Sequence, residues 1–339
     1  MLYAVQQPAT LDPAAAIISP SSRNRSRLRA ATIMLGFAFV NAARGGHQLM
    51  WSIAVFASNE AQTVPQSLQQ FSATMHGQTM TVQVLANGCR DKTSAVVEEY
   101  CQRHPHVKLH VIELADKANA WNVYVHDLAP AAEVHFFSDG NKTIVPGSLE
   151  RLAAALHNNP YANAAAALPM NGRSRRQWRS GIRYGQRVAG GLYALRGTFI
   201  QRLREHNVYL PTGVLCNDAV ISLFADTNLG EYHLAPGIVH DVHAGFFFHS
   251  LSPFRLGDYP IWFKRKFRIA LKGYQQQFIG QYLQQHDLKT LPAHIDEIYD
   301  NKFVRLETRW FRRDSVFHLL ALRHIRERMR ALSPTEPVS

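Results

Sequence analysis

From residue 51 onward, short apolar runs alternate with segments of helical periodicity. Strand-like apolar runs cover residues 51–57, 81–86, 107–114, 134–137 and 164–168. Between them, apolar residues recur three and four positions apart, which is typical of one face of a helix; these helical segments are 64–75, the stretch after Asp91, 118–128, and a helix from a first turn at Pro146 to His157. The alternation predicts an α/β sheet with helices on both faces, in which the wholly apolar run 164–168 is an interior strand.

The pattern changes after residue 169. Residues 173–187 are rich in arginine and contain no acid, and Gly190-Gly191 leads into a short apolar strand. Asn217-Asp218 opens a helical run over 219–224, and residues 233–239 are strand-like. From residue 263 the chain is helical and basic, and its apolar side chains are spaced to share one helix face: Phe267, Leu271, Tyr274, Phe278 and Tyr282.

Composition restricts the class of protein. Hydrophobic residues make up 46% of the 339 residues and charged residues 18%, which is typical of a globular protein. The net charge of +12 favours an anionic partner, such as a nucleotide-sugar phosphate, a nucleic acid or an anionic membrane. The three cysteines have no metal-ligand spacing, which fits a reducing compartment and no structural zinc.

The segment FFSDGN, residues 136–141, carries the first candidate chemistry. Asp139 ends an apolar strand, and Asn141 lies two places later, so their side chains can point the same way. Two hard oxygen ligands in this arrangement suit a divalent cation that holds a diphosphate. An Asp-Gly turn at the end of a strand is the competing interpretation.

Three further stretches complete a recognisable order: IAVFASNE at 53–60, VLANGCRDKT at 84–93 and CNDAVISLF at 216–224. Together with FFSDGN they resemble the motifs of the family-2 glycosyltransferases, which are nucleotide-diphosphosugar transferases of the GT-A type. The resemblance spans about residues 51–245. It implies a Rossmann-like, mostly parallel sheet flanked by helices, and a hexosyltransferase-type enzyme of bacterial cell-envelope polysaccharide biosynthesis.

The resemblance implies a donor site at the carboxyl ends of the strands, where ligands of open α/β sheets bind. Ala57 and Glu60 would lie beside the nucleotide, Asn87 would contact the base, and Lys117 would contact the diphosphate. The competing interpretations are a helix cap near Ser58, an Asn-Gly turn at Asn87 and a solvated lysine.

A metal site is implied as well. Asp139 and Asn141 would ligate Mg²⁺ or Mn²⁺, which neutralises the diphosphate as the sugar departs. Asn141 replaces the family's second aspartate, and an amide oxygen is a weaker ligand than a carboxylate. His240 or His243 is a candidate third ligand, with a structural histidine as the alternative.

Asp218 is the candidate general base. In an inverting transfer, a carboxylate on a rigid element takes the proton of the acceptor hydroxyl, and the start of a helix provides that rigidity. A helix N-cap is the alternative role. Gly190 and Gly191 would let the backbone approach a sugar closely, or simply allow a tight entry into the strand. The arginine run 173–187 suits a phosphate-bearing acceptor or a solvated loop.

The two ends of the chain depart from this pattern. Four arginines precede an apolar run over 31–40, which resembles a signal peptide in order but is too short to span a bilayer. We favour a disordered or weakly helical leader over 1–49, or a start at Met34 or Met50. The tail lacks the Gln-x-x-Arg-Trp motif and the membrane helices of processive synthases. Its basic amphipathic helices suit either an anionic membrane surface or ordinary packing with a solvated face.

The sequence therefore predicts a leader over 1–49, a GT-A domain over 50–245 and a helical, basic C-terminal extension over 246–339. The predicted activity is inverting transfer of a sugar from a UDP- or GDP-linked donor to a glycan, glycolipid or other cell-envelope acceptor. It is expected in the cytoplasm, with peripheral contact at the inner membrane face. A catalytically inactive nucleotide-sugar-binding homologue is the alternative, because amides occupy positions 87, 141 and 217. Nucleic-acid binding has only the charge in its favour.

Overall fold

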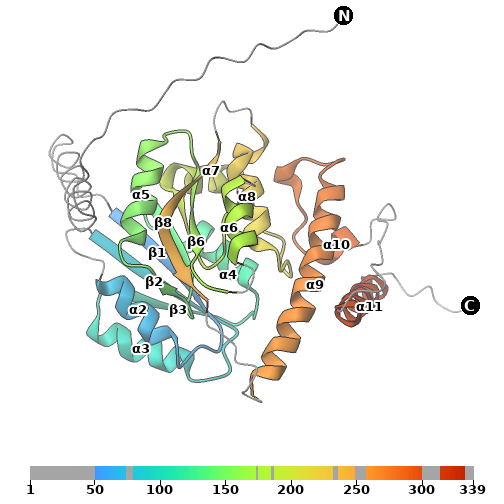
Figure 1. The fold of residues 1–339 in the computed structure, drawn as a ribbon, viewed down its shortest axis with the longest axis horizontal. Coiled ribbons are helices and arrows are strands. Elements are labelled where there is room, and N and C mark those ends of the chain that lie inside the picture. Colours follow the sequence, from blue (N-terminus) through green and yellow to red (C-terminus); the bar gives the residue numbers. More distant parts are fainter. Residues whose placement is uncertain are drawn as a thin grey trace, which may run out of the picture. The chain divides into compact units, whose positions relative to one another are not determined.

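A computed structural model describes residues 50–73, 79–172, 175–184, 187–231, 236–248, 257–299 and 314–332, without the side chains at positions 178, 183, 184, 258 and 332. The chain divides into two units, Met1–Gln48 and Leu49–Ser339. The predicted leader, Arg173 and the first part of the predicted strand 233–239 lie outside the described residues. All described elements belong to the second unit (Figure 1).

The second unit is built on one sheet of eight strands in the order β3-β2-β1-β4-β7-β6-β8-β5. Strands β3, β2, β1 and β4 are parallel neighbours, β7 lies antiparallel between β4 and β6, and β8 runs parallel to β6. The strands are β1 Met50–Ala57, β2 Thr79–Asn87, β3 Val107–Ile112, β4 Val134–Asp139, β5 Thr143–Ile144, β6 Ala164–Pro169, β7 Leu192–Arg196 and β8 Ile238–Phe247. The predicted mixed α/β architecture with a mostly parallel sheet is confirmed.

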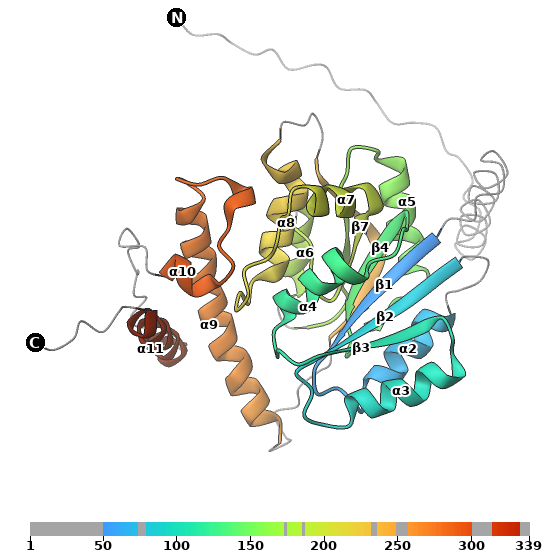
Figure 2. The ribbon, with the colours of Figure 1, turned by 180° about the vertical axis from the view of Figure 1, so that it is seen from behind.

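Helices connect and cover the strands. They are α2 Val64–Ala73, α3 Thr93–Arg103, α4 Lys117–Val123 with the π-helical η1 Tyr124–Leu128, α5 Ser148–Asn158, α6 Arg175–Tyr184, α7 Gly197–Glu205, α8 Asn217–Asp226, α9 Asp258–Tyr282, α10 Ile295–Tyr299 and α11 Ser315–Leu332, with short 3₁₀ turns η2 Asn228–Gly230 and η3 Leu288–Thr290. Figure 1 shows α5 in front of the sheet. Figure 2, seen from behind, shows α4 in front of the opposite face.

Several predicted boundaries move. Strand β4 continues to Asp139, so the candidate ligand still belongs to the strand. The helix predicted to start at Pro146 begins two residues later, at Ser148, because Gly147 takes a left-handed conformation (φ 76°). The strand predicted over 233–239 is displaced: β8 runs through His240 and His243 rather than ending before them. The arginine run forms the helix α6 rather than a loop.

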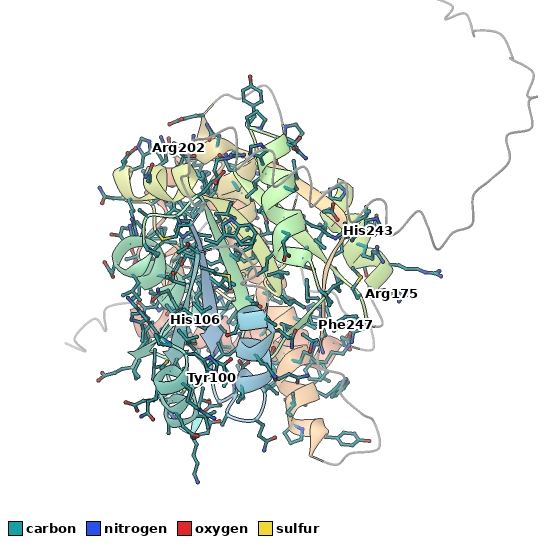
Figure 3. All side chains as sticks on the ribbon, turned by 90° about the vertical axis from the view of Figure 1, so that its left-hand side faces the viewer. Tyr100, His106, Arg175, Arg202, His243 and Phe247 are labelled. Carbon is teal, nitrogen blue, oxygen red and sulfur yellow. The ribbon has the colours of Figure 1, made fainter. Side chains whose placement is uncertain are left out.

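The core lies on both faces of the central strands. Every residue of β6 is buried, which fits the prediction of an interior strand. Two pairs of aromatic rings pack around β4. Trp51 packs edge-on against Phe136, and Tyr193 stacks on Phe137. The two ends of the sheet are well separated: in Figure 3, Tyr100 and His106 lie at one side of the view and His243 and Phe247 at the other.

The described C-terminal helices pack on one another and contact the rest of the unit through α9 and through the segment before α10, where Thr212 N donates to Ala293 O. Leu271, Tyr274 and Phe278 are buried, as the shared helix face predicted, while Phe267 and Tyr282 are half-buried. Helix α11 packs along α9, and Arg328 of α11 forms an ion pair with Asp296 of α10. Within the described residues, none of the helices has the length and hydrophobicity that crossing a membrane requires.

Candidate active site

Three predicted donor-site residues lie at the carboxyl ends of three neighbouring parallel strands. Asn87 ends β2, Ala57 ends β1 and Asp139 ends β4. The register pairs Ala57 with Ala86 and Phe56 with Asp139, so the three ends form one edge. Asn87 is 5% exposed, and its side-chain amide forms no hydrogen bond with a described residue. These three residues therefore lie along one edge of the sheet, at the strand ends where the sequence predicted them.

The position of Asp139 follows from the spacing of side chains along β4, which matches the spacing along one face of α4 and η1. Side chains at every second position of β4 face one side of the sheet, and positions 117, 121 and 124 of α4 and η1 share one helix face. Tyr124 accordingly meets His135 through a hydrogen bond of 2.9 Å, and Trp121 stacks near Phe137. One turn further on, Lys117 meets Asp139.

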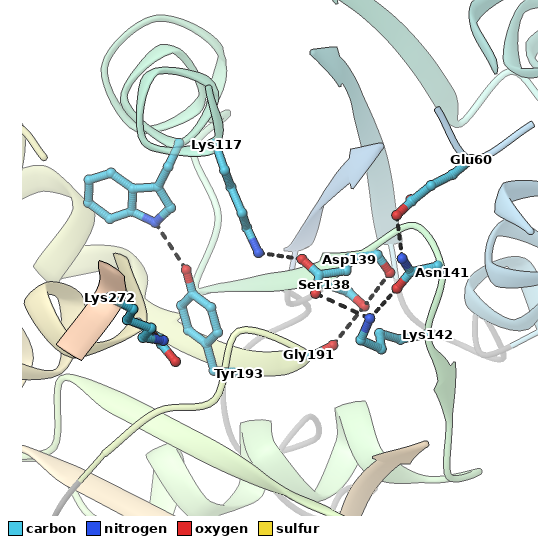
Figure 4. Close-up of polar contacts among 11 residues, drawn as sticks. Glu60, Lys117, Ser138, Asp139, Asn141, Lys142, Gly191, Tyr193 and Lys272 are labelled. Carbon is cyan, nitrogen blue, oxygen red and sulfur yellow. Dashed lines mark hydrogen bonds and ion pairs between the residues drawn. The ribbon is translucent and has the colours of Figure 1, made fainter. Parts of the chain in front are cut away.

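Two ammonium groups flank the Asp139 carboxylate. Lys117 Nζ donates to Oδ1, and Lys142 Nζ lies 3.4 Å from Oδ2 (Figure 4). Burial favours the neutral acid, but the two positive charges outweigh it and hold the pKa of Asp139 below its ordinary value. The carboxylate is thus ionised at neutral pH. Sequence reasoning missed Lys142, although its place three residues after Asp139 was a signal.

Asn141 is held in the same cluster. Its Oδ1 accepts a hydrogen bond from Lys142 Nζ, and its Nδ2 donates to Glu60 Oε1. Burial, and then the charge of Asp139, raise the pKa of Glu60 to about 8, so this side chain is neutral at pH 7. Glu60 Oε2 is buried and has no hydrogen-bond partner among the described residues. A Cβ at Gly140 would lie 2.6 Å from that atom, so a larger residue there would displace the Glu60 carboxyl group.

The turns that follow β1 and β2 are joined beside this cluster. Glu60 N donates to Thr93 Oγ1 over 2.8 Å, and Arg90 N donates to Asn59 Oδ1 over 2.8 Å. Asp91 Oδ1 accepts from Thr93 N, and Asp91 Oδ2 accepts from Ala61 N. These bonds fix Glu60 and Ala57 relative to Asn87, which a nucleotide-binding edge requires. A side-chain cap by Ser58, the competing interpretation, is not among the described hydrogen bonds.

Asp218 lies in the first turn of α8, as predicted, and is 15% exposed. Its Oδ1 accepts from Lys272 Nζ of α9 and from Ala219 N. The α8 cap is Cys216, which makes no side-chain capping bond, so the N-cap role considered for Asp218 is not the observed one. Lys272 gave no sequence signal, because 54 residues separate the two partners.

A buried glutamine ties the segment before α8 to α9. Gln275 Oε1 accepts from Leu215 N over 2.7 Å, and its Nε2 donates to Gly213 O and Tyr299 Oη. On the other side of this segment, Asp116 Oδ2 accepts from Gly213 N over 2.8 Å. Because Asp116 immediately precedes Lys117, one segment connects the surroundings of both carboxylates.

Tyr193 lies between the two carboxylates. Its hydroxyl accepts a hydrogen bond from Trp121 Nε1 over 3.1 Å. Burial raises the pKa of Tyr193 well above its ordinary value; the Trp121 hydrogen bond acts in the opposite sense, and the negative charges of Asp139 and Asp218 raise it further. Figure 4 shows Tyr193 with Asp139 on one side and Lys272, the ion-pair partner of Asp218, on the other. The sequence contained no indication of this role.

The two glycines of the predicted pair differ. A Cβ at Gly191 would overlap the Phe246 ring at 2.2 Å, and Gly191 O accepts from Ser138 Oγ, so packing explains this glycine. Gly190 borders the candidate site, because a Cβ there would lie 3.5 Å from Lys117 Nζ. Asn122, on the same helix as Lys117, exchanges two hydrogen bonds with the Leu210 backbone.

Other predicted residues are not brought to Asp139. His240 lies on β8, opposite Ala166, and strands β7 and β6 separate β8 from β4. With neighbouring strands about 4.8 Å apart, the backbone of His240 is about 14 Å from that of β4. Arg175 and Arg176 are exposed on α6. A pocket of about 330 Å³ lies between α8 and α9, lined in part by Cys216, but neither carboxylate lines it.

The donor atoms fit a hard cation to a limited extent. Asp139 Oδ2 and Asn141 Oδ1 both face one positive centre, the Lys142 ammonium, which shows that the two oxygens converge. A carboxylate and an amide oxygen are suitable Mg²⁺ or Mn²⁺ ligands when substrate phosphates complete the shell. Among the described residues no group of three or more His, Cys, Asp or Glu side chains could enclose a metal alone.

Two solved structures illustrate what this chain is similar to. The mannosyltransferase PcManGT from Pyrobaculum calidifontis, in complex with GDP-Man and Mn²⁺, aligns with a TM-score of 0.54 and 16% identity, over 85% of this chain and 76% of that chain. TarS from S. aureus, in complex with UDP-GlcNAc, aligns with a TM-score of 0.48 and 14% identity, over 83% and 81% of the two chains. No curated protein sequence matches significantly.

At these identities the structural likeness concerns the fold, and it supports the GT-A fold expected from the sequence. The family assignment has a separate basis, because the model of the family Glycosyl transferase family 2 matches residues 52–222, about half of the chain. The match contains the turn after β1, the ends of β2 and β4, and Asp218. The chain is a member of glycosyl transferase family 2.

Proposed function

We propose that the protein is an inverting glycosyltransferase that moves one sugar from a nucleotide-diphosphosugar to an acceptor hydroxyl. The observation that carries the proposal is the placement of two carboxylates on rigid elements: Asp139 at the end of β4, and Asp218 in the first turn of α8, paired with Lys272, which lies across Tyr193 from Asp139 in Figure 4. One carboxylate is available for the donor and the other for the acceptor. Inversion requires this division, because the acceptor attacks the sugar carbon from the side opposite the leaving diphosphate.

The donor half would bind the nucleotide at the ends of β1, β2 and β4. Asn87 and Ala57 would contact the base and ribose, and neutral Glu60 could donate a hydrogen bond from its unpartnered oxygen. Asp139 and Asn141 would hold Mg²⁺ or Mn²⁺, which supplies positive charge to the diphosphate when bound. Lys117 would donate directly to the phosphates, since charge-assisted hydrogen bonds are short and strong.

The acceptor half would use Asp218 as the general base. Its carboxylate would accept the acceptor proton while Lys272 keeps it oriented and stabilises its charge. Tyr193, whose raised pKa keeps the hydroxyl neutral, separates the two negative groups. The donor base, expected to be uracil or guanine, and the acceptor, a glycan, glycolipid or other cell-envelope molecule, follow from the family. Action in the cytoplasm, at the inner membrane face, is part of the same proposal.

A screen of UDP- and GDP-sugars tests the donor half. A true donor with Mn²⁺ should raise the unfolding temperature, and at about 100 times its dissociation constant it should add about 2.7 kcal/mol. Turnover to the free nucleoside diphosphate should accompany binding. The absence of both effects for all UDP- and GDP-sugars would contradict the proposal.

An inactive nucleotide-sugar-binding protein is the second candidate. The ion pair of Asp218 with Lys272 favours it, because the pair occupies the atom that must receive the proton. The two candidates separate in one experiment: tight donor binding with no turnover in the presence of varied acceptors supports the binder, and turnover above background excludes it.

A further inference from the structure

Exposed apolar side chains concentrate on the C-terminal helices. Thirteen large hydrophobic side chains are exposed among the described residues, and seven of them lie on α9 and α11. Five belong to the first half of α9: Tyr259, Ile261, Trp262, Phe263 and Ile269. Scattered exposed apolar residues need no explanation, but this density on two helices marks an interaction surface.

The first half of α9 is more exposed than the second, although the rings of Trp262 and Phe263 also pack edge-on against Phe317 of α11. Ile261 and Trp262 are 54% and 44% exposed although they point about 100° apart on the helix. From Ala270 onward the same helix buries one face, with Leu271 4% exposed. Figures 1 and 2 both show the first turns of α9 beyond the labelled strands and helices. The apolar face that packs in the second half thus continues into solvent in the first half.

The polar residues among these side chains are all basic. Residues 259–269 contain Lys264, Arg265, Lys266 and Arg268 and no acidic residue. Lys266 is paired with Asp314 of α11, and the Arg265 guanidinium lies 5.9 Å from the centre of the Phe248 ring. Lys264 and Arg268 are exposed. We call the exposed side chains of residues 259–269 the α9 surface.

The combination of exposed apolar side chains and basic residues on the α9 surface favours an anionic bilayer over a protein partner. Aromatic rings are enriched at the membrane–water interface, and lysine and arginine extend from there to anionic headgroups. Each basic residue near such a surface contributes about 1 kcal/mol. Lysine is depleted in protein–protein interfaces, whereas here lysine and arginine alternate with the apolar side chains. Charge complementarity therefore points to anionic lipid.

We propose that the α9 surface docks on an anionic membrane and thereby presents the acceptor side of the site to a lipid-linked sugar. This inference depends on the proposed function for its second half. The same helix carries Lys272, the partner of Asp218, ten residues after Trp262. At a rise of 1.5 Å per residue, the two positions are about 15 Å apart along the helix axis. The general base would then act on a hydroxyl held a short distance above the bilayer.

Vesicle co-sedimentation of the full chain tests the docking. Vesicles of phosphatidylcholine alone and of an equal mixture of phosphatidylcholine and phosphatidylglycerol serve as probes. Binding to the mixed vesicles, weakened by added salt, is the expected result, because salt screens surface charge. Absence of binding to mixed vesicles, or equal binding to both kinds, overturns the proposal.

Variants of the α9 surface locate the contact. Ile261→Glu with Ile269→Glu places two carboxylates on exposed positions without removing a described aromatic contact, and glutamate is a good helix former. The partition coefficient should fall at least about tenfold, because both apolar burial and charge attraction are reduced. Val111→Glu with Tyr161→Glu, which are 66% and 67% exposed on the other part of the unit, is the matched control and should bind as the unmodified chain does.

Two other occupants of the α9 surface have distinct outcomes. Concentration-dependent dimerisation abolished by the α9 variant, without vesicle binding, would assign the surface to a second copy and overturn the proposal. Unchanged vesicle binding by the α9 variant would show that another segment makes the contact, which also overturns it. Calorimetry with UDP and GDP, done on the unmodified chain, separates this result from the proposed function: nucleotide binding by a chain that does not bind the mixed vesicles refutes docking alone.

Discussion

Asp139 and Asp218 are both partly buried carboxylates paired with lysine, yet their surroundings are assembled in different ways. Asp139 is 26% exposed and has two ammonium partners, Lys117 and Lys142, which lie 22 and 3 residues away in the chain. Asp218 is 15% exposed and has one, Lys272, which belongs to the C-terminal extension. In the proposed function, the donor half would therefore lie at the strand ends, whereas the acceptor half would depend on α9.

The difference matches what the donor and the acceptor each require of the proposed site. A nucleotide diphosphate demands the same charges in every donor, and adjacent strand ends supply them. Acceptors differ widely, and an appended helix that reaches Asp218 can change without disturbing the nucleotide edge. Gln275 makes this connection specific, because its three hydrogen bonds join α9 to the segment that precedes α8.

The largest expected effect comes from removing each carboxylate. Asp218→Asn should lower kcat by about 10² to 10⁴-fold, the usual contribution of general base catalysis, and leave donor binding unchanged. Asp139→Ala should instead weaken Mn²⁺-dependent donor binding at least about tenfold, since it removes the carboxylate that would hold the cation. Steady-state transfer assays and calorimetry measure both. The comparison fails if both variants keep full activity.

A second test uses pH and concerns the sheet below Asp139. Burial, and then the charge of Arg204, lower the pKa of His135 to about 4, against 6.5 for a free histidine. The unfolded chain therefore binds more protons between pH 6.5 and 4, so the folded state loses stability as pH falls through that window, by about 3 kcal/mol in total. Urea unfolding at several pH values measures this loss.

The control for this test is His135→Gln, which should be less stable at pH 7 but should show a flatter dependence below pH 6.5. His106, His110 and His126 also have lowered pKa values, caused first by burial, and they act in the same direction. An unchanged slope in the variant would assign the acid sensitivity to those residues.

The connection between α9 and the acceptor half can be broken at Gln275. Gln275→Leu removes the hydrogen bonds to Leu215 N, Gly213 O and Tyr299 Oη, and a buried polar group left unsatisfied costs about 1–3 kcal/mol. We expect a destabilisation of about 2 kcal/mol together with a lower kcat and unchanged nucleotide affinity. Gln277→Leu, an exposed neighbour on the same helix, is the matched control. Loss of nucleotide affinity as well would contradict the separation of the halves.

The smallest effect is expected at Lys142. Its ammonium faces the two oxygens that would hold a metal, so Lys142→Met should tighten Mn²⁺ binding by about tenfold, or 1.4 kcal/mol. The signal of free Mn²⁺ in electron paramagnetic resonance titrations reports the affinity directly. Lys92→Met, an exposed lysine at the start of α3, should have no effect. Weaker Mn²⁺ binding would show that Lys142 supports the metal rather than competing with it.

Much of the donor half was predictable. Strand ends are visible as apolar runs that stop at polar residues, and β1, β2 and β4 follow this rule, so Ala57, Asn87 and Asp139 were placed on one edge. The prediction was weaker where a residue's neighbours are distant in the chain. His240 looked suitable as a ligand from its type alone, but two strands separate its own strand from that of Asp139.

The sequence by itself determined the α/β class, the family, the strand ends and the two acidic residues, because periodicity and local motifs depend on neighbours along the chain. Only the tertiary structure decided that β7 enters antiparallel beside β4, so that Tyr193 stands between the carboxylates, and that Lys272 reaches Asp218. Those contacts join segments tens of residues apart. Their geometry follows from how the helices pack on the sheet, which no local pattern of residues records.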